Sequence, residues 1–163
     1  MIIERLLTHG LGSQYPNRIV VHCMAAEIDY KGKRYTAWEF LNLVDPPDKV
    51  GLSAHILIQP DGTRIRCRPD TSMAFHAKGF NTDSLGVEVL VPDVYNLNEL
   101  QQRTKTEWVS HEQFESLVQQ VMIWKKEFHI EKIDRHSDLD PKRRWFDPGD
   151  GFPWEELLKR TWE

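Results

Sequence analysis

Residues 84–91 limit the possible folds of this chain most strongly, because nearly every position in this stretch is apolar. Both alternating sets of positions carry aliphatic side chains, which predicts a strand covered on both faces, as in a sheet flanked by helices. Glu88 lies in the middle of this strand, and burying a carboxylate without partners costs several kcal/mol. The strand therefore predicts a wet cleft or a metal ion beside Glu88, with exposure on an edge strand as the alternative.

Other short segments predict further strands. Residues 18–23 form a β-branched run that reads as a second buried strand, with His22 at its C-terminal end, where ligand sites of open α/β sheets collect. Residues 54–68 predict a β-hairpin around a Pro-Asp-Gly turn, with a wet face formed by the arginines at 64, 66 and 68. Residues 130–133 predict a short strand.

Three helices and two irregular segments complete the pattern. Thr36 caps a helix that runs to Val44 and stops at residues 45–48. Ser110 and Gln113 form a capping box before a helix with apolar residues at three- and four-residue spacing. A terminal helix begins at residues 152–154. Residues 1–16 read as an irregular lead-in and residues 92–107 as a long loop, so we expect one α/β domain over residues 1–163.

Composition excludes several classes of protein. With 40% hydrophobic and 28% charged residues, the chain has the make-up of a soluble globular domain. A net charge of -4 gives no reason to expect nucleic acid or an anionic membrane as a partner. The two cysteines allow at most one disulfide, which favours a reducing compartment. The N-terminus is too charged for a signal peptide, so we expect a cytoplasmic protein.

Three residues far apart in the sequence supply a set of metal ligands. His22 ends a predicted strand, whereas His136 and Asp147 lie in the charged segment 135–149. Each residue alone has an ordinary interpretation, as a core histidine, an exposed histidine or a turn residue. Together they provide two imidazoles and one carboxylate, the usual set for a catalytic zinc that keeps a fourth position for water.

Three further polar residues are candidates for roles beside such a metal. Glu88 is a candidate general base for water at such a metal. His55 and His76 are surrounded by small and apolar residues. Each of these histidines can be interpreted as a fourth metal ligand, a hydrogen-bonding residue of a substrate groove or a core residue, and the residues alone leave these alternatives open.

Five motifs in one order, spanning about residues 18–155, resemble a known family. They are Val20-Val21-His22, Ser53-Ala54-His55 followed by Pro60-Asp61-Gly62, Ala74-Phe75-His76-Ala77, Asn81 with Ser84-Leu85-Gly86-Val87-Glu88, and His136-Ser137-Asp138 with Asp147-Pro148-Gly149. This order is similar to that of the zinc-dependent N-acetylmuramoyl-L-alanine amidases of the type 2 amidase and peptidoglycan-recognition-protein superfamily. The strongest likeness is to cytoplasmic recycling amidases and phage endolysin amidases. The implied fold is α/β, with a central mixed β-sheet flanked by helices.

The resemblance also implies roles for individual residues. It makes His22, His136 and Asp147 the ligands of a Zn²⁺ cofactor, and it makes Glu88 the catalytic base. The remaining candidates bind substrate in a groove. They are His76, Asn81 and His55.

One segment departs from the family pattern. Asp147 follows His136 by eleven residues, one more than the family spacing, and the family's lysine two positions before the aspartate is missing. A one-residue insertion makes Arg144 the cation that stabilises the oxyanion, with Arg143 and Lys142 as alternatives. An arginine provides a planar fork of donors instead of a lysine point charge.

The expected reaction is hydrolysis of the amide bond between N-acetylmuramic acid and L-alanine, in peptidoglycan or in muropeptides. A non-catalytic peptidoglycan-binding module of the same fold is the first alternative, and a zinc hydrolase of another amide is the second. We expect a monomer whose partner is peptidoglycan or muropeptide. The expected location is cytoplasmic, or, for a phage lysin, the cell wall after release through a holin.

Overall fold

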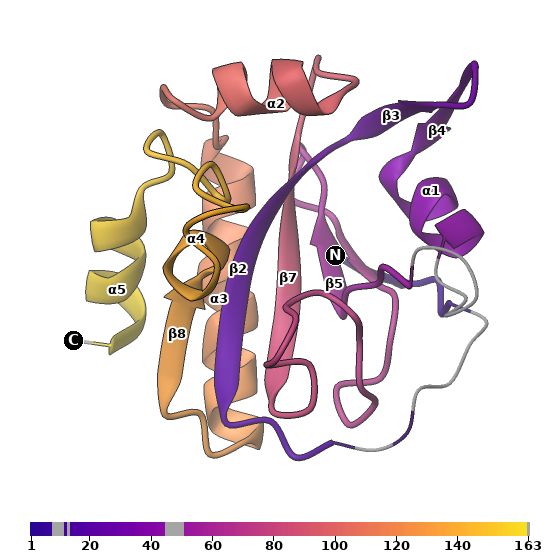
Figure 1. Cartoon of the computed structure of the whole chain (residues 1–163). Helices are drawn as coiled ribbons and strands as arrows, with labels where there is room; N and C mark the ends of the chain where they lie inside the picture. The colour runs from indigo at the N-terminus through magenta and orange to yellow at the C-terminus, as the bar shows by residue number, and fades with distance from the viewer. Residues whose placement is uncertain (8–11, 13, 45–50, 163) are drawn as a thin grey trace.

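A six-stranded mixed sheet forms the centre of the computed structural model, which describes residues 1–7, 12, 14–44 and 51–162 (Figure 1). In spatial order, its strands are β1 (Ile2–Glu4), β6 (Arg64–Arg66), β5 (Ile56–Ile58), β7 (Ser84–Val91), β2 (Arg18–Ala25) and β8 (Lys132–Arg135). Neighbouring strands are parallel except β5 and β6, which form the predicted hairpin. The mixed α/β sheet predicted from the sequence is confirmed.

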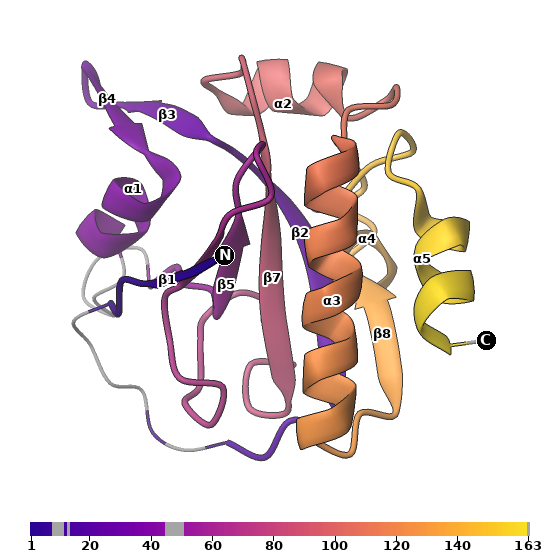
Figure 2. The same cartoon turned by 180° about the vertical axis from the view of Figure 1, so that it is seen from behind.

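One face of the sheet is covered by helix α3 (His111–Glu127), with α5 (Trp154–Trp162) packed beside it (Figure 2). The capping box at Ser110 and Gln113 is present, as predicted. Odd-numbered residues of β2 and β7 face this side and join α3 in the larger apolar core. The members of that core from these three elements include Ile19, Val21, Leu85, Val87, Val89, Leu117, Val121 and Trp124.

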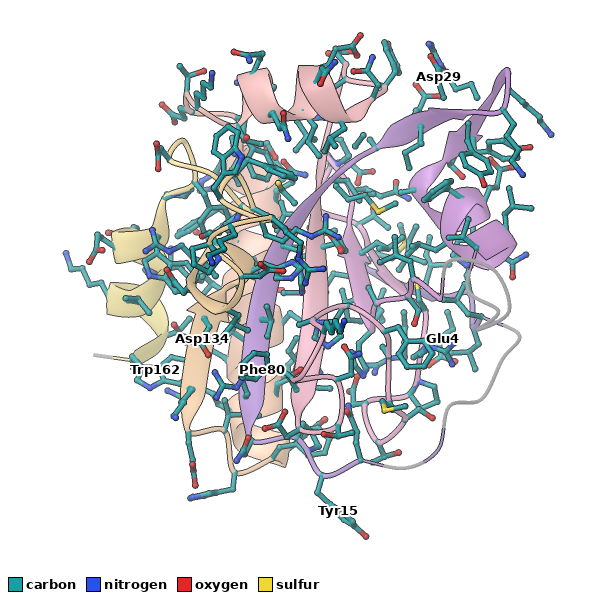
Figure 3. The ribbon with its side chains drawn as sticks, viewed as in Figure 1. Glu4, Tyr15, Asp29, Phe80, Asp134 and Trp162 are labelled. Carbon is teal, nitrogen blue, oxygen red and sulfur yellow. The ribbon has the colours of Figure 1, made fainter. Side chains whose placement is uncertain are left out.

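The opposite face is covered only in part. Helix α1 (Ala37–Val44) packs on a smaller apolar cluster with Leu57 and Leu90. The short helix α4 (His136–Leu139) follows β8 directly and lies beside β2 (Figure 1). At the start of β2, Arg18 pairs with Asp134, and its guanidinium lies 4.9 Å from the ring centroid of Phe80 (Figure 3). Between these elements, the middle of β2 and β7 is left for polar side chains.

Three sequence-based expectations were wrong. Residues 1–16 are not wholly irregular, since β1 pairs in parallel with β6. Residues 92–107 contain helix α2 (Leu97–Arg103), which begins where the Asn96 side chain accepts a hydrogen bond from the Glu99 N–H. Arg68 is buried at 2% exposure instead of lying on a wet face. The predicted helix stop at residues 45–48 lies outside the described residues.

A hairpin of β3 (Glu27–Tyr30) and β4 (Lys33–Thr36) was not predicted from the sequence. Its turn places Lys31 and Gly32 at positive φ, 50° and 79°, which a two-residue hairpin turn requires. In the described part of the chain, no helix combines the length and apolar character that crossing a bilayer needs.

Candidate metal centre

Parallel pairing of β2 with β8 brings the first two candidate ligands together. Val21 lies opposite Arg135 in the register, so the next residues, His22 and His136, emerge side by side although 114 positions separate them. His136 begins α4, and the chain then turns back so that Asp147 lies against the same histidines. The fold therefore joins the three residues that the sequence analysis grouped.

The three donor atoms lie at distances that suit one metal ion. His22 Nδ1 is 2.9 Å from His136 Nδ1 and 3.4 Å from Asp147 Oδ2, and His136 Nδ1 is 2.9 Å from the same oxygen. Ligand atoms about 2.0–2.1 Å from a tetrahedral zinc lie roughly 3.3 Å from one another. All three side chains are buried, and they form a group of donors able to hold a metal ion. The donor set therefore fits zinc.

Asp147 is oriented by the backbone around it. Its Oδ1 accepts a hydrogen bond of 2.7 Å from the Cys23 N–H, which leaves Oδ2 directed at the histidines. Burial alone would raise the pKa of this carboxyl, but the adjacent imidazoles of His136 and His22 outweigh burial and hold the pKa below its usual value. Asp147 is therefore ionised, which is the form that an anionic metal ligand requires.

His22 is suited to metal binding by its surroundings. Burial lowers the pKa of its imidazole, and this effect exceeds the opposing influence of the Asp147 carboxylate. A neutral imidazole is the form that binds a metal.

Glu88 lies directly opposite His22 in the β2–β7 register, so the two side chains share one face of the sheet. The strand β7 is central, which excludes the alternative that Glu88 is exposed on an edge strand. Glu88 is only 7% exposed, and its Oε2 has no hydrogen-bond partner. Burial, followed by the charge of Asp147, raises its pKa well above the ordinary value, with Arg144 acting in the opposite direction. A buried carboxylate with one free oxygen is thus directed at the candidate metal centre.

A cavity of about 110 Å³ connects these groups. Its lining includes His22, Glu88, His136, Arg144 and Asp147. Of the three rival cations, Arg144 is the one in this lining, whereas Arg143 forms a 2.7 Å hydrogen bond with Asp140.

An open groove of about 400 Å³ continues from this cavity. Arg144 and His76 line both spaces, and Lys78 and Asn81 line the groove. Asn81 also has a local role, because its Oδ1 accepts hydrogen bonds from the backbone N–H groups of His76 and Ala77. The structure therefore places these two predicted groove residues at the groove.

His55 lies elsewhere. Its side chain is 0% exposed, its Nδ1 accepts a hydrogen bond from the Gly86 N–H, and its Nε2 lies 2.8 Å from the Ser72 carbonyl oxygen. Burial lowers the pKa of His55 to about 4. Since it lines neither the cavity nor the groove, we treat His55 as a supporting core residue instead of a substrate-binding one. Among the described residues, the group of metal-capable donors includes neither His55 nor His76.

Two residues near the site were not predicted from the sequence to have a role. A Cβ atom added at Gly86 would lie 2.5 Å from Cγ of His76, so only glycine leaves room for that ring. Ser84 contacts the far side of the same ring. The sequence did carry a signal for this pair, because Ser84 and Gly86 are small residues at alternate positions of the apolar strand 84–91.

Comparison with known proteins gave one family and several structures. A family model described as N-acetylmuramoyl-L-alanine amidase matches residues 12–150. The structure is similar to that of the N-acetylmuramoyl-L-alanine amidase LysC from Clostridium intestinale, with 26% identity, 98% of this chain and 96% of that chain covered, and a TM-score of 0.73.

Two more distant likenesses concern the fold alone. A selenomethionine derivative of AmpD has 20% identity and a TM-score of 0.70, covering 97% of this chain and 93% of that one. Drosophila peptidoglycan recognition protein SA has 13% identity and a TM-score of 0.68, covering 100% and 95%. A search of curated proteins found no match.

Proposed function

This chain belongs to the N-acetylmuramoyl-L-alanine amidase family, and from that premise we propose that it hydrolyses the amide between N-acetylmuramic acid and L-alanine at a zinc centre. The proposal rests chiefly on one observation: His22, His136 and Asp147 converge with Glu88 around a single cavity. Zinc bound there supplies Lewis-acid chemistry, which acidifies water and polarises a carbonyl group.

Glu88 has the properties of the proton carrier for this reaction. Its unpartnered Oε2 and raised pKa suit a carboxylate that takes a proton from the attacking water. The same oxygen then returns the proton to the L-alanine nitrogen as the amide bond breaks. Arg144, in the lining of the same cavity, donates hydrogen bonds to the carbonyl oxygen as negative charge develops on it.

The groove suits an acidic substrate. Lys78 and Arg144 supply two cations, and the groove-lining residues that the structure describes include no carboxylate. Stem peptides carry carboxylates, so a muropeptide complements this charge. The arginines at 64 and 66 are not part of the lining, and Arg66 is paired with Asp70 at 2.5 Å.

Two biological settings share this chemistry. A cytoplasmic enzyme would act on soluble muropeptides, whereas a phage lysin would act on intact peptidoglycan. Comparing product release from purified anhydro-muropeptide and from intact sacculi separates them, because a recycling enzyme requires the soluble substrate.

The direct test is product analysis on an N-acetylmuramoyl-peptide. We expect release of a peptide with a free L-alanine amino group, loss of that release after chelation, and recovery with added zinc. The Glu88→Gln variant, still loaded with zinc, is the matched inactive control. If the loaded protein binds muropeptide in calorimetry but releases no peptide, the chain is a binding module and the proposal is wrong.

A further inference from the structure

The ring of His22 has a second nitrogen that faces away from the candidate metal centre. This atom, Nε2, lies 3.0 Å from Nδ1 of His76, and the two rings are nearly perpendicular at 88°. A hydrogen bond between two imidazole nitrogens requires one of them to carry the proton and the other to accept it. The direction of this bond decides which nitrogen of His22 is free to bind a metal.

The far side of His76 settles the direction. Its Nε2 lies 3.2 Å from Ser84 Oγ and 3.4 Å from the Ser84 carbonyl oxygen. The Ser84 hydroxyl donates its only proton to the Phe80 carbonyl oxygen at 2.5 Å, so Oγ can only accept from the ring. His76 Nε2 therefore carries the proton, and in a neutral ring Nδ1 has a lone pair.

We propose that His76 and Ser84 are positioning residues that hold His22 in the tautomer protonated at Nε2. The proton then points away from His136 and Asp147, and the Nδ1 lone pair of His22 points towards them. The inference rests on the proposed function in that the lone pair serves a metal ion there. Partners of this kind orient metal-binding histidines in many proteins, and removing them costs about 10- to 100-fold in metal affinity.

The surrounding structure protects the hydrogen-bonded chain of His22, His76 and Ser84, here called the relay, from water. His22, His76 and Ser84 are 1%, 5% and 0% exposed, so water does not compete for their hydrogen bonds. The absence of a side chain at Gly86 leaves room for the His76 ring, and Asn81 holds the backbone of His76. The same arrangement explains why the sequence places a glycine and a serine on the polar face of β7.

Four single variants separate the relay from general packing. His76→Leu fills the space without an acceptor, whereas His76→Asn keeps an oxygen near the position of Nδ1. Ser84→Ala removes the hydroxyl but leaves the backbone carbonyl that also faces His76. Ser53→Ala is the matched control, because the Ser53 hydroxyl accepts from the Phe75 N–H in the same loop and no hydrogen bond joins it to the ring of His76.

Two measurements are made on each variant whose far-ultraviolet circular dichroism spectrum matches that of the parent, which shows that the variant is folded. The first is the tautomer of His22 in the metal-free protein, read from nitrogen-15 chemical shifts of labelled histidine at neutral pH. The second is zinc affinity, measured by competition with a chromophoric chelator. Neither measurement depends on amidase activity.

We expect the parent to show His22 protonated at Nε2, and His76→Leu to lose that preference and bind zinc about 10- to 100-fold more weakly. His76→Asn should recover most of the affinity, Ser84→Ala should show a smaller loss, and Ser53→Ala should resemble the parent. The relay is wrong if His76→Leu keeps both the tautomer and the affinity, if His76→Asn is as weak as His76→Leu, or if Ser53→Ala equals Ser84→Ala. A parent that binds no zinc would instead contradict the proposed function, while its His22 tautomer would still report on the relay.

Discussion

The two faces of strands β2 and β7 carry different kinds of side chain, although the same two strands form both faces. Odd-numbered positions such as Val21 and Val87 are aliphatic, fully buried and packed in the core with α3. Even-numbered positions on the other face include His22, Ser84 and Glu88, which are also buried but polar. Burial alone therefore does not distinguish the stabilising face from the reactive one.

What differs is how each face satisfies its side chains. Aliphatic side chains need only volume and contact, so their contribution is distributed over many neighbours. The polar side chains need partners at specific positions, and Glu88 retains one oxygen without any. Mutations on the aliphatic face should lower the free energy of unfolding without changing turnover. Mutations on the polar face should lower turnover with less effect on the free energy of unfolding.

The largest expected effect is on the reactive face. Glu88→Gln should lower the turnover number by on the order of 10²–10⁴-fold, because the amide cannot accept a proton from water. Bound zinc should be unchanged, since Glu88 is not among the metal-capable donors. Steady-state hydrolysis of an N-acetylmuramoyl-peptide, with zinc measured on the same sample, checks this. Glu156→Gln on exposed α5 is the control, and normal turnover in Glu88→Gln would remove Glu88 as the base.

The opposite face gives the next effect. Leu85→Ala should lower the free energy of unfolding by about 2–5 kcal/mol, since it empties a fully buried position beside α3. Turnover per folded molecule should remain that of the parent. Urea unfolding and activity below the transition measure the two quantities. A large loss of turnover in folded Leu85→Ala would contradict the separation of the two faces.

Buried histidines on the polar side should make stability sensitive to acid. The pKa of His55 is about 4 in the folded chain against 6.5 as the ordinary value, so the unfolded chain binds the proton more readily. The contribution of neutral His55 to the free energy of unfolding is complete above about pH 6.5. It falls by about 3 kcal/mol as the pH decreases to about 4. Urea unfolding across this range tests the slope. His55→Gln should flatten it, and an unchanged slope would exclude His55 as its source.

The smallest effect concerns the cation beside the cavity. Arg144→Ala should lower turnover by about tenfold, less than the 10²–10³ of an enclosed oxyanion donor, because Arg144 is exposed. Arg144→Lys should recover part of this loss. Arg143→Ala should have no effect, since Arg143 pairs with Asp140 on the surface. Equal losses in the Arg143 and Arg144 variants would show that only the general positive charge of the segment matters.

Long, strongly patterned segments could be predicted from the sequence, whereas short ones could not. The largely apolar eight-residue stretch of β7 and the capping box of α3 specify their elements locally. By contrast, β1 has three residues and exists because β6 offers it a parallel edge. Helix α2 has seven residues and only one of them, Leu100, is buried, so it shows no clear apolar period.

The same contrast applies to the candidate site. His22, His136 and Asp147 were grouped from their chemical types and from the resemblance to a family. The sequence could not show that His76 lies at the cavity and His55 does not, because both histidines lie among small residues. The two differ only in that the ring of His76 faces the cavity. Ring orientation depends on tertiary contacts such as the one between Gly86 and His76, which a linear pattern does not contain.

Zinc content is the most direct measure of the central claim that a metal centre lies on the polar face of β2 and β7. Elemental analysis after dialysis should find about one zinc per chain in the parent and in Glu88→Gln, as a single three-ligand site requires. Asp147→Ala, which removes a donor that both histidines contact, should retain almost none. Parent-like zinc content in a folded Asp147→Ala protein would contradict the account.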